Sequence, residues 1–170
     1  MAEDDRDEEI YLYMRGPEEI VPLDVKYVRI HHSVRRIHAR AFRRRSQLRT
    51  VTDGDGLEAI GRGSFDRCKS LCEIMISPTV RSIDIEEFAF SRCSQLRTVT
   101  GGDGLEFIEG NSFARCKSLC EIMISPTVSV IKEHAFCRCS HLRTVTGGDG
   151  LELGLGLEGP SQTLFLCRES

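Results

Sequence analysis

Apolar residues return at a regular interval along most of the chain. The clearest marker is a phenylalanine, and successive copies are 23, 25, 23 and 23 residues apart. A leucine stands six positions after each phenylalanine, and a valine or isoleucine follows three positions later. The marker residues are Phe42, Phe65, Phe90, Phe113 and Phe136. A period of this length predicts a repeat protein in which each repeat forms one coil of a continuous stack.

Each repeat contains an alternation of apolar and polar residues that predicts a short strand. In the repeat that contains Leu119, the segment Leu-x-x-Ile-x-Ile alternates as a half-buried strand does. Ser-Pro or Gly-Asp-Gly follows and predicts a turn, because proline removes a donor and glycine permits positive φ. The stretch around the next phenylalanine is compatible with a short helix or a 3₁₀ turn. Because one repeat cannot bury its apolar edge alone, the repeats must stack to form a core.

Two kinds of repeat alternate along the chain. Ser64–Val80 and Ser112–Val128 are identical at sixteen of seventeen positions, and Asp66 against Ala114 is the single difference. In the other kind, the second isoleucine of the strand is replaced, so we expect shorter strands there. The replacing residues are Asp53, Gly101 and Gly147.

One coil shows the complete repeat pattern. Its positions are Leu119, Ile122, Ile124, Pro126, Val128, Ile131, Ala135, Phe136, Cys139 and Leu142. The pattern resembles the BspA-type leucine-rich repeat, and the similarity recurs over about residues 25–151. The resemblance implies an α/β repeat fold: a right-handed leucine-rich-repeat solenoid with short parallel strands on one face and short helices or turns on the other. It also implies an interaction or surface-recognition protein rather than an enzyme.

The pattern weakens toward both ends of the chain. Arg45 replaces the cysteine of the family pattern, which marks an atypical, capping first coil. Beyond Leu151 the register fails, because Gly154 and Gly159 stand where an isoleucine and a phenylalanine are expected. We therefore expect an acidic disordered tail over residues 1–10, a solenoid of about five to six coils over 11–151 and a degenerate tail over 152–170.

Charge is unevenly distributed, although the net charge is only −3. Residues 1–9 carry six acidic side chains, whereas residues 26–49 carry nine Lys and Arg and no acid. The chain has no apolar run long enough for a membrane helix and no signal-peptide pattern at its start. We therefore expect a cytoplasmic protein, with a nuclear location as the alternative, no membrane partner and reduced cysteines.

Four cysteines stand three residues after a repeat phenylalanine. Cysteine packs as a small apolar residue, so this spacing predicts a stacked, buried file. Zinc binding is the alternative, but the pairs Cys68/Cys72 and Cys116/Cys120 lie two coils apart, roughly 10 Å, which is too far for one tetrahedral ion. We expect no metal. The file comprises Cys68, Cys93, Cys116 and Cys139.

Catalytic and cofactor motifs are not recognisable in the sequence. The five histidines form no triad or metalloprotease pattern. The segment that begins Asp53-Gly-Asp55-Gly lacks later EF-hand ligands, because Leu57 and Ser64 stand at two ligand positions. We expect a protein without enzyme activity and without a cofactor.

A basic segment within residues 29–49 suggests a second kind of partner. Lys and Arg clusters attract nucleic acids, although the same charges suit the solvated edge of a folded coil. A nucleic-acid-associated protein is therefore the alternative hypothesis. The residues of this basic patch are Arg35, Arg36, Arg40, Arg43, Arg44 and Arg45.

The outward side of the predicted sheet is the expected binding face for a protein partner, whose identity the sequence does not reveal. Solenoids bind partners on such extended surfaces, and exposed methionines provide adaptable apolar contacts. Ser77 and Ser125 are expected to point outward with this face. The face residues are Tyr27, Arg29, Thr50, Thr52, Glu73, Met75, Thr98, Thr100, Glu121, Met123, Thr144 and Thr146. A truncated repeat array without independent function is the third hypothesis.

Overall fold

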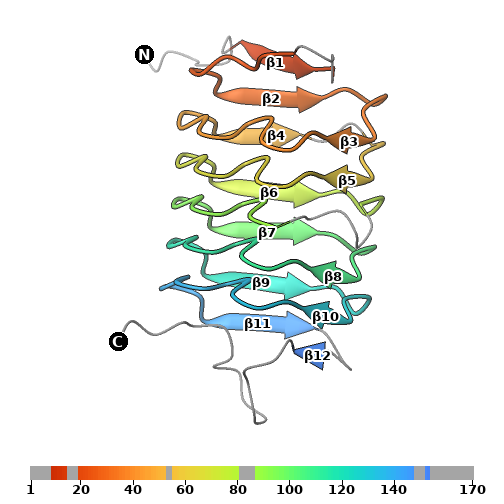
Figure 1. Ribbon diagram of the computed structural model, residues 1–170, viewed down its shortest axis with the longest axis vertical. Helices are drawn as coiled ribbons and strands as arrows, with labels where there is room; N and C mark the ends of the chain where they lie inside the picture. Colours follow the sequence, from red (N-terminus) through yellow and green to blue (C-terminus); the bar gives the residue numbers. More distant parts are fainter. Residues whose placement is uncertain (1–8, 15–18, 53–54, 81–86, 148–151, 154–170) are drawn as a thin grey trace, which may run out of the picture.

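The computed structural model describes residues 9–14, 19–52, 55–80, 87–147 and 152–153. In this part of the chain, coil stacks on coil to form an elongated solenoid that begins at β1 and ends at β11 and β12 (Figure 1). The predicted tails, residues 1–10 and 152–170, lie mostly outside the described residues. The predicted leucine-rich-repeat solenoid with parallel strands is confirmed.

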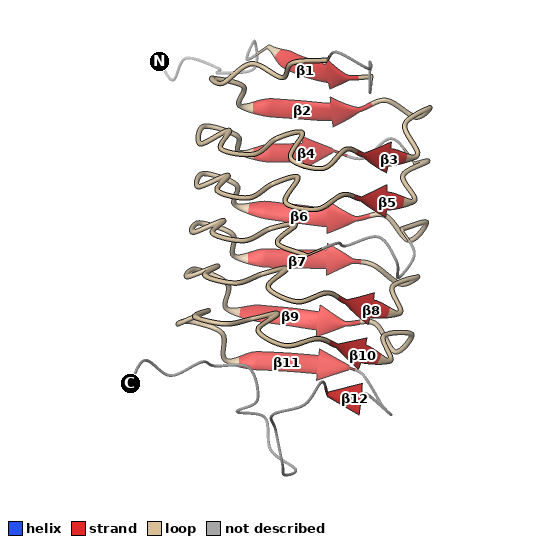
Figure 2. Cartoon of the chain, in the orientation of Figure 1, coloured by secondary structure: helices blue, strands red, loops and turns tan. Residues whose placement is uncertain are grey.

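The long strands lie side by side on one face of the solenoid (Figure 2). They are β1 (Ile10–Tyr13), β2 (Tyr27–Ile30), β4 (Thr50–Thr52), β6 (Glu73–Ile76), β7 (Thr98–Gly101), β9 (Glu121–Ile124) and β11 (Thr144–Gly147). All pairs are parallel, in the orders β1-β2-β4 and β6-β7-β9-β11. Equivalent repeat positions face each other across the ladders, as in Ile74↔Val99. This register places the apolar positions of successive coils in one buried file.

Short strands line a second side of the coils. They are β3 (Arg36–Ile37), β5 (Ala59–Ile60), β8 (Phe107–Ile108), β10 (Val130–Ile131) and β12 (Glu152–Leu153). Their ladders have the orders β3-β5 and β8-β10-β12. The intervening segment 81–86, which lies within the 25-residue interval between Phe65 and Phe90, is outside the described residues.

A stack of phenylalanine rings forms the centre of the core. The ring centroids of neighbouring coils are 5.1 to 5.3 Å apart and the ring planes are within 10° of parallel. Every ring is at most 1% exposed. Burial of one such ring contributes roughly 1.5–3 kcal/mol, and each ring pair adds about 0.5–1.5 kcal/mol. The stack runs through Phe42, Phe65, Phe90, Phe113 and Phe136.

Short helices or turns were the two alternatives expected opposite the sheet, and the described residues form turns there, so the helix alternative is wrong (Figure 2). Bonds such as Cys68 N–H to Phe65 C=O (3.1 Å) close single turns. Positive φ at the residues two before and two after each repeat phenylalanine prevents these turns from continuing as a helix. These residues are Arg40, Arg44, Gly63, Arg67, Phe88, Arg92, Asn111, Arg115, His134 and Arg138.

The expectation of shorter strands in alternate coils is also wrong for β7 and β11, which have four residues like β6 and β9. Gly101 extends β7 by pairing with Ile76. A Cβ on Gly101 would lie 2.0 Å from the carbonyl oxygen of Ile76, so glycine alone allows this approach. β4 ends at Thr52, and the expected shortening residue Asp53 lies outside the described residues.

Arg45 joins the first coil to the segment that precedes it. Its Nε donates to the carbonyl oxygen of Val21 at 3.0 Å, and its Nη1 donates to the carbonyl oxygen of Arg43 at 3.0 Å. In later coils the cysteine at this position donates to the preceding coil, as Cys68 Sγ does to Phe42 C=O (3.0 Å). In the coil that lacks this cysteine, the longer arginine side chain therefore makes the hydrogen bond to the preceding segment.

Candidate functional site

The exposed face of the long strands carries most of the predicted partner-binding residues. In β6 the burial alternates: Ile74 and Ile76 are buried, whereas Glu73 and Met75 are exposed. Arg29, Thr52, Thr100, Glu121 and Met123 are also exposed, and Tyr27, Thr50 and Thr98 are half-buried. Thr144 and Thr146 pair through the backbone with Glu121 and Met123, and their side chains lie outside the described part.

Two methionines dominate the apolar surface of this face. The side chain of Met75 is 69% exposed and that of Met123 is 74% exposed. They stand at equivalent positions of β6 and β9, and β7 lies between these strands. Both side chains point away from the buried isoleucines of the same strands, so the sheet face carries an exposed apolar side chain at each of these two levels.

Ser77 and Ser125 do not belong to this face, so the expectation that they point outward is wrong. Each is only 7% exposed. The strands end at the preceding isoleucines, and each serine bonds to the threonine two residues later (Oγ to Oγ1, 2.7 Å). The chain turns at this point, so the alternation of the strand no longer decides where the side chain points.

A hollow of about 360 Å³ lies on the face between the two ladders. Thr50 and Thr52 of β4 line one side, and β6 and β7 line the other. Among the described residues, no ladder joins β4 to β6. The hollow therefore lies where the strand pairing is interrupted, and Met75 stands in its wall. Its other lining residues are Val51, Asp55, Glu73, Ile74, Ser77, Pro78, Thr98 and Thr100.

The strand β1 extends this face by two apolar side chains that the sequence analysis did not assign to it. Ile10 pairs with Tyr27 and Leu12 pairs with Arg29. Both side chains therefore continue the two lines of outward-pointing residues on the long strands. Ile10 is 52% exposed and Leu12 is 46% exposed. The alternation in Ile-Tyr-Leu-Tyr was the available signal, although the acidic residues before it obscured the strand.

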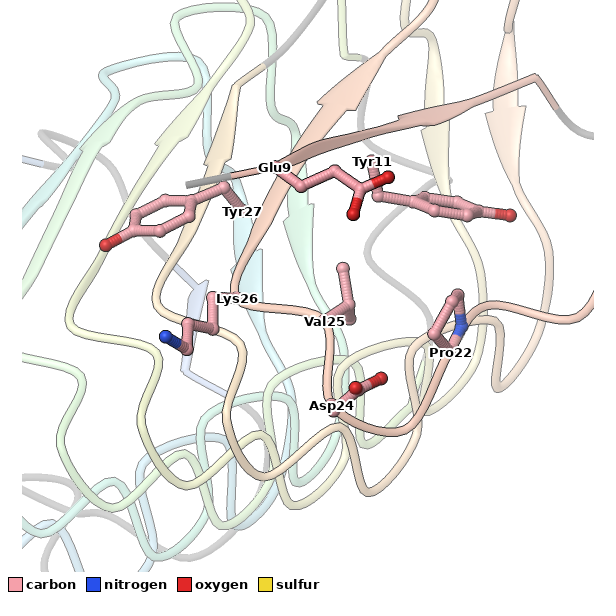
Figure 3. A pocket seen from close by; sticks show the side chains of 7 residues that line it. All are labelled: Glu9, Tyr11, Pro22, Asp24, Val25, Lys26 and Tyr27. Atoms are coloured by element: carbon pink, nitrogen blue, oxygen red, sulfur yellow. The ribbon is translucent and has the colours of Figure 1, made fainter. Parts of the chain in front are cut away.

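A second hollow, of about 290 Å³, lies at the β1 end of the solenoid (Figure 3). In the picture, Tyr11 and Tyr27 extend from neighbouring strands in opposite directions. The Tyr11 hydroxyl donates to Glu19 Oε1 at 3.0 Å. Burial and this bond raise the pKa of Tyr11 to about 12. The hollow combines the acids Glu9 and Asp24 with Lys26 and shows no catalytic arrangement.

The predicted basic patch does not form one uniform surface. Arg35 pairs with Glu58 at 3.3 Å, and Arg43 pairs with Asp66 at 3.1 Å. The guanidinium of Arg45 is bound to the carbonyl oxygen of Val21. Arg36 lies in β3, whereas Arg40 and Arg44 lie in the turns that follow. At least two of the six charges are therefore neutralised locally, and a third, Arg45, serves the fold.

The predicted file of buried cysteines is confirmed. All four are 0% exposed, and each thiol donates to the carbonyl oxygen of the preceding coil's phenylalanine at 3.0 to 3.2 Å. Burial raises the pKa of Cys68 to about 12 and that of Cys93 and Cys116 well above the ordinary value. These thiols are structural. Within the described residues, no group of three or more His, Cys, Asp or Glu is placed to bind a metal ion.

Parallel ladders of long strands, one long strand per coil, and a continuous phenylalanine stack define a leucine-rich-repeat solenoid. The family model for the BspA type leucine rich repeat region matches six copies over residues 23–143. The chain belongs to this family. Repeats of this class typically act as protein-interaction modules and are typically not enzymes.

Solved structures share the fold. The chain is 29% identical to a leucine rich cell surface protein from Faecalibacterium prausnitzii, with a TM-score of 0.69, over 74% of this chain and 33% of that chain. It is 24% identical to a T. pallidum leucine rich repeat protein, with a TM-score of 0.66, over 75% of this chain and 68% of that chain. The chain thus spans about a third of the first relative. No curated protein matches the chain. The described residues form no helix that could cross a membrane.

Proposed function

We propose that this protein is a non-enzymatic interaction module that binds a protein partner on the exposed face of the long strands. The exposure of Met75 and Met123 is the observation that carries the proposal. Family membership supports it, because leucine-rich repeats typically bind proteins. The predicted nucleic-acid role of the 29–49 patch, the predicted truncated array and the predicted cytoplasmic location stay predictions.

The chemistry of the face indicates the kind of surface that would fit it. Methionine is flexible and polarisable, so Met75 beside the hollow can adapt to an apolar side chain of the partner. Burial of one methionine contributes roughly 1.5–3 kcal/mol. Glu73 and Glu121 flank the two methionines on the same strands. A partner that inserts an apolar side chain between basic residues would complement both features.

A double substitution tests the proposal. Tagged wild type is used to capture and identify a partner, and the Met75→Asp, Met123→Asp protein is then compared with it for binding to the purified partner. Two buried charges without partners should weaken the complex at least about a hundredfold. The control carries Ile20→Asp and Leu23→Asp, which introduce the same charges at apolar residues that are 85% and 71% exposed but lie outside the face. Equal binding by both variants would contradict the proposal.

A further inference from the structure

A row of arginines lies on the turns that precede the long strands. Each member stands two residues after a repeat phenylalanine and has a φ between 60° and 66°. The phenylalanine rings of adjacent coils are 5.1 to 5.3 Å apart, so the row repeats at about the same interval. We name it the arginine row, and it comprises Arg44, Arg67, Arg92, Arg115 and Arg138.

Backbone hydrogen bonds hold the arginine row at this spacing. The N–H of Arg67 donates to the carbonyl oxygen of Ser91, the residue before the next member of the row, at 2.8 Å. The same bond recurs at every step, with lengths of 2.7 to 2.8 Å. A ligand with repeated charges would therefore meet a preorganised row and would not have to order a loop.

The turn geometry does not require arginine at these positions. A positive φ favours glycine, and other residues adopt it at a cost of roughly 1–2 kcal/mol. The other positive-φ position, two residues before each repeat phenylalanine, holds a different residue type in each of the five coils, for example Gly63 and Asn111. The residue just before each member of the row also differs in every coil. Arginine alone is constant, so its side chain rather than the turn explains its presence.

The surroundings of the arginine row are strongly positive. The turn segments 38–45, 61–69, 87–94, 109–117 and 132–140 contain twelve Lys and Arg against four Asp and Glu, which is +8 on a chain of net charge −3. A hollow of about 270 Å³ beside Arg67 and Arg92 is also lined by Arg40, Arg43 and Arg62. Among the described residues, Arg44, Arg92 and Arg115 have no acidic partner.

We propose that the arginine row binds the phosphate backbone of a single-stranded nucleic acid without reading its sequence. The guanidinium group is the side chain best shaped for paired bonds to phosphate oxygens. A flexible single strand can follow the row, whereas one strand of a duplex winds away from it. The phenylalanine stack beneath the row is buried, so bases find no aromatic platform and no base readout is expected.

Two other polyanions fit the row less well. An extended acidic peptide repeats its same-side carboxylates at roughly 6.7 Å, a spacing that the strand conformation fixes, whereas the phosphate spacing of a single strand adjusts to a row of about 5 Å through several rotatable backbone bonds. An anionic membrane presents a plane of charge, and a row one side chain wide contacts little of it. Both remain outcomes that the experiment can return.

Fluorescence anisotropy with a labelled oligo(dT) of about 15 nucleotides tests the proposal. For five phosphate contacts, the logarithm of the binding constant should fall with the logarithm of salt concentration with a slope of about −3.5. The triple variant Arg67→Gln, Arg92→Gln, Arg115→Gln should lose about two units of that slope and bind at least about tenfold more weakly at roughly 50 mM salt. Circular dichroism and thermal unfolding verify that each variant is folded.

The matched control is the triple variant Arg49→Gln, Arg97→Gln, Arg143→Gln. These arginines are exposed, whereas Arg67 and Arg92 are half-buried. They occur only in alternate coils and form no continuous row. This variant has the same net charge as the first and should retain the wild-type slope. Equal losses in the two variants, or no oligo(dT) binding by the wild type, would overturn the proposal. Preferential binding of polyglutamate, heparin or phosphatidylserine vesicles over oligo(dT) would overturn the assigned ligand class.

Discussion

The ring of Tyr13 packs against the ring of Phe42, with the centroids 4.9 Å apart and the planes tilted by 57°. Every later pair in the phenylalanine stack is within 10° of parallel. Tyr13 is 2% exposed and ends the stack at the β1 side. Because the family match begins at residue 23, Tyr13 and its strand form a cap outside the repeats proper.

Removal of this ring should destabilise the whole solenoid. The Tyr13→Ala protein should lose about 3–5 kcal/mol of unfolding free energy, since the substitution leaves a cavity and uncovers Phe42. Urea denaturation followed by circular dichroism measures the loss. Tyr13→Phe keeps the ring and should lose much less unfolding free energy than Tyr13→Ala. If both variants lost the same free energy, the hydroxyl rather than the ring would be the stabilising group.

Arg45 provides a second test of the N-terminal cap. Arg45→Leu preserves apolar bulk but leaves the Val21 carbonyl oxygen without its guanidinium donor, which should cost about 1–3 kcal/mol of unfolding free energy. The neighbouring Arg44 is exposed, so Arg44→Leu should change stability by less than about 0.5 kcal/mol. Thermal and urea unfolding of the two proteins compare them directly. Equal stabilities would mean that water replaces the guanidinium at no cost.

Residue spacing was enough to predict the core of this fold. The repeat phenylalanines, and the leucines that follow the first four of them, are buried because every coil offers the same apolar positions to the same stack. The buried cysteine file follows from the same periodicity. Local alternation failed at Ser77 and Ser125, because the strand ends one residue earlier and the chain turns there.

Backbone geometry accounts for the features that the sequence did not predict. The Phe-x-Arg spacing of the arginine row is visible in the sequence, but arginine carries no signature of positive φ, so the absence of helices in the described turns could not be inferred from residue types. The hollow beside Met75 depends on an interruption between β4 and β6, although both segments carry strand-like alternation. Long-range pairing, rather than local propensity, decides where such an interruption falls.

Three of the four buried thiols predict how stability depends on pH: burial raises the pKa of Cys68, Cys93 and Cys116, whereas a hydrogen bond with Cys116 lowers the pKa of Cys139. In the folded state the pKa of Cys68 is raised to about 12, whereas an unfolded thiol ionises near pH 9. The unfolded state therefore loses its proton first, and stability must fall as the pH rises above about 9. Each such thiol contributes a fall of about 1.4 kcal/mol per pH unit between these values. Below pH 9 the thiol contribution is fully present.

Urea unfolding between pH 8 and pH 10.5 measures this slope. The Cys68→Ala protein is less stable at every pH because it has a cavity. Its unfolding free energy should nevertheless fall less steeply with pH, because the contribution of one buried thiol is missing. Cys72 is exposed and lies outside the file, so Cys72→Ala is the matched control and should keep the wild-type slope. Identical slopes in all three proteins would show that the buried thiols do not control the pH dependence.

Asp66 is the single residue that distinguishes the two copies of the duplicated segment, and it lies against the arginine row. Its Oδ2 is 3.1 Å from Arg43 Nε and 3.8 Å from Arg67 Nε. Asp66→Ala introduces the residue of the other copy, Ala114, but it removes a mostly buried carboxylate from Arg43, so the protein should still fold with a loss of about 1–3 kcal/mol. If the arginine row binds phosphates, removal of this carboxylate should tighten oligo(dT) binding and make the salt slope more negative by about 0.7, because Arg43 beside the row becomes available as one further phosphate contact.

The same change of charge elsewhere on the solenoid separates local from overall electrostatics. Glu73 is exposed on the sheet face, so Glu73→Ala raises the net charge as Asp66→Ala does but leaves the arginine row unchanged. Anisotropy titrations across salt concentrations should show the steeper slope for Asp66→Ala alone. Of these two carboxylates, only Asp66 lies close enough to Arg43 and Arg67 to compete with a phosphate. Equal increases in oligo(dT) affinity for the two variants would therefore mean that binding depends on net charge and not on the arginine row.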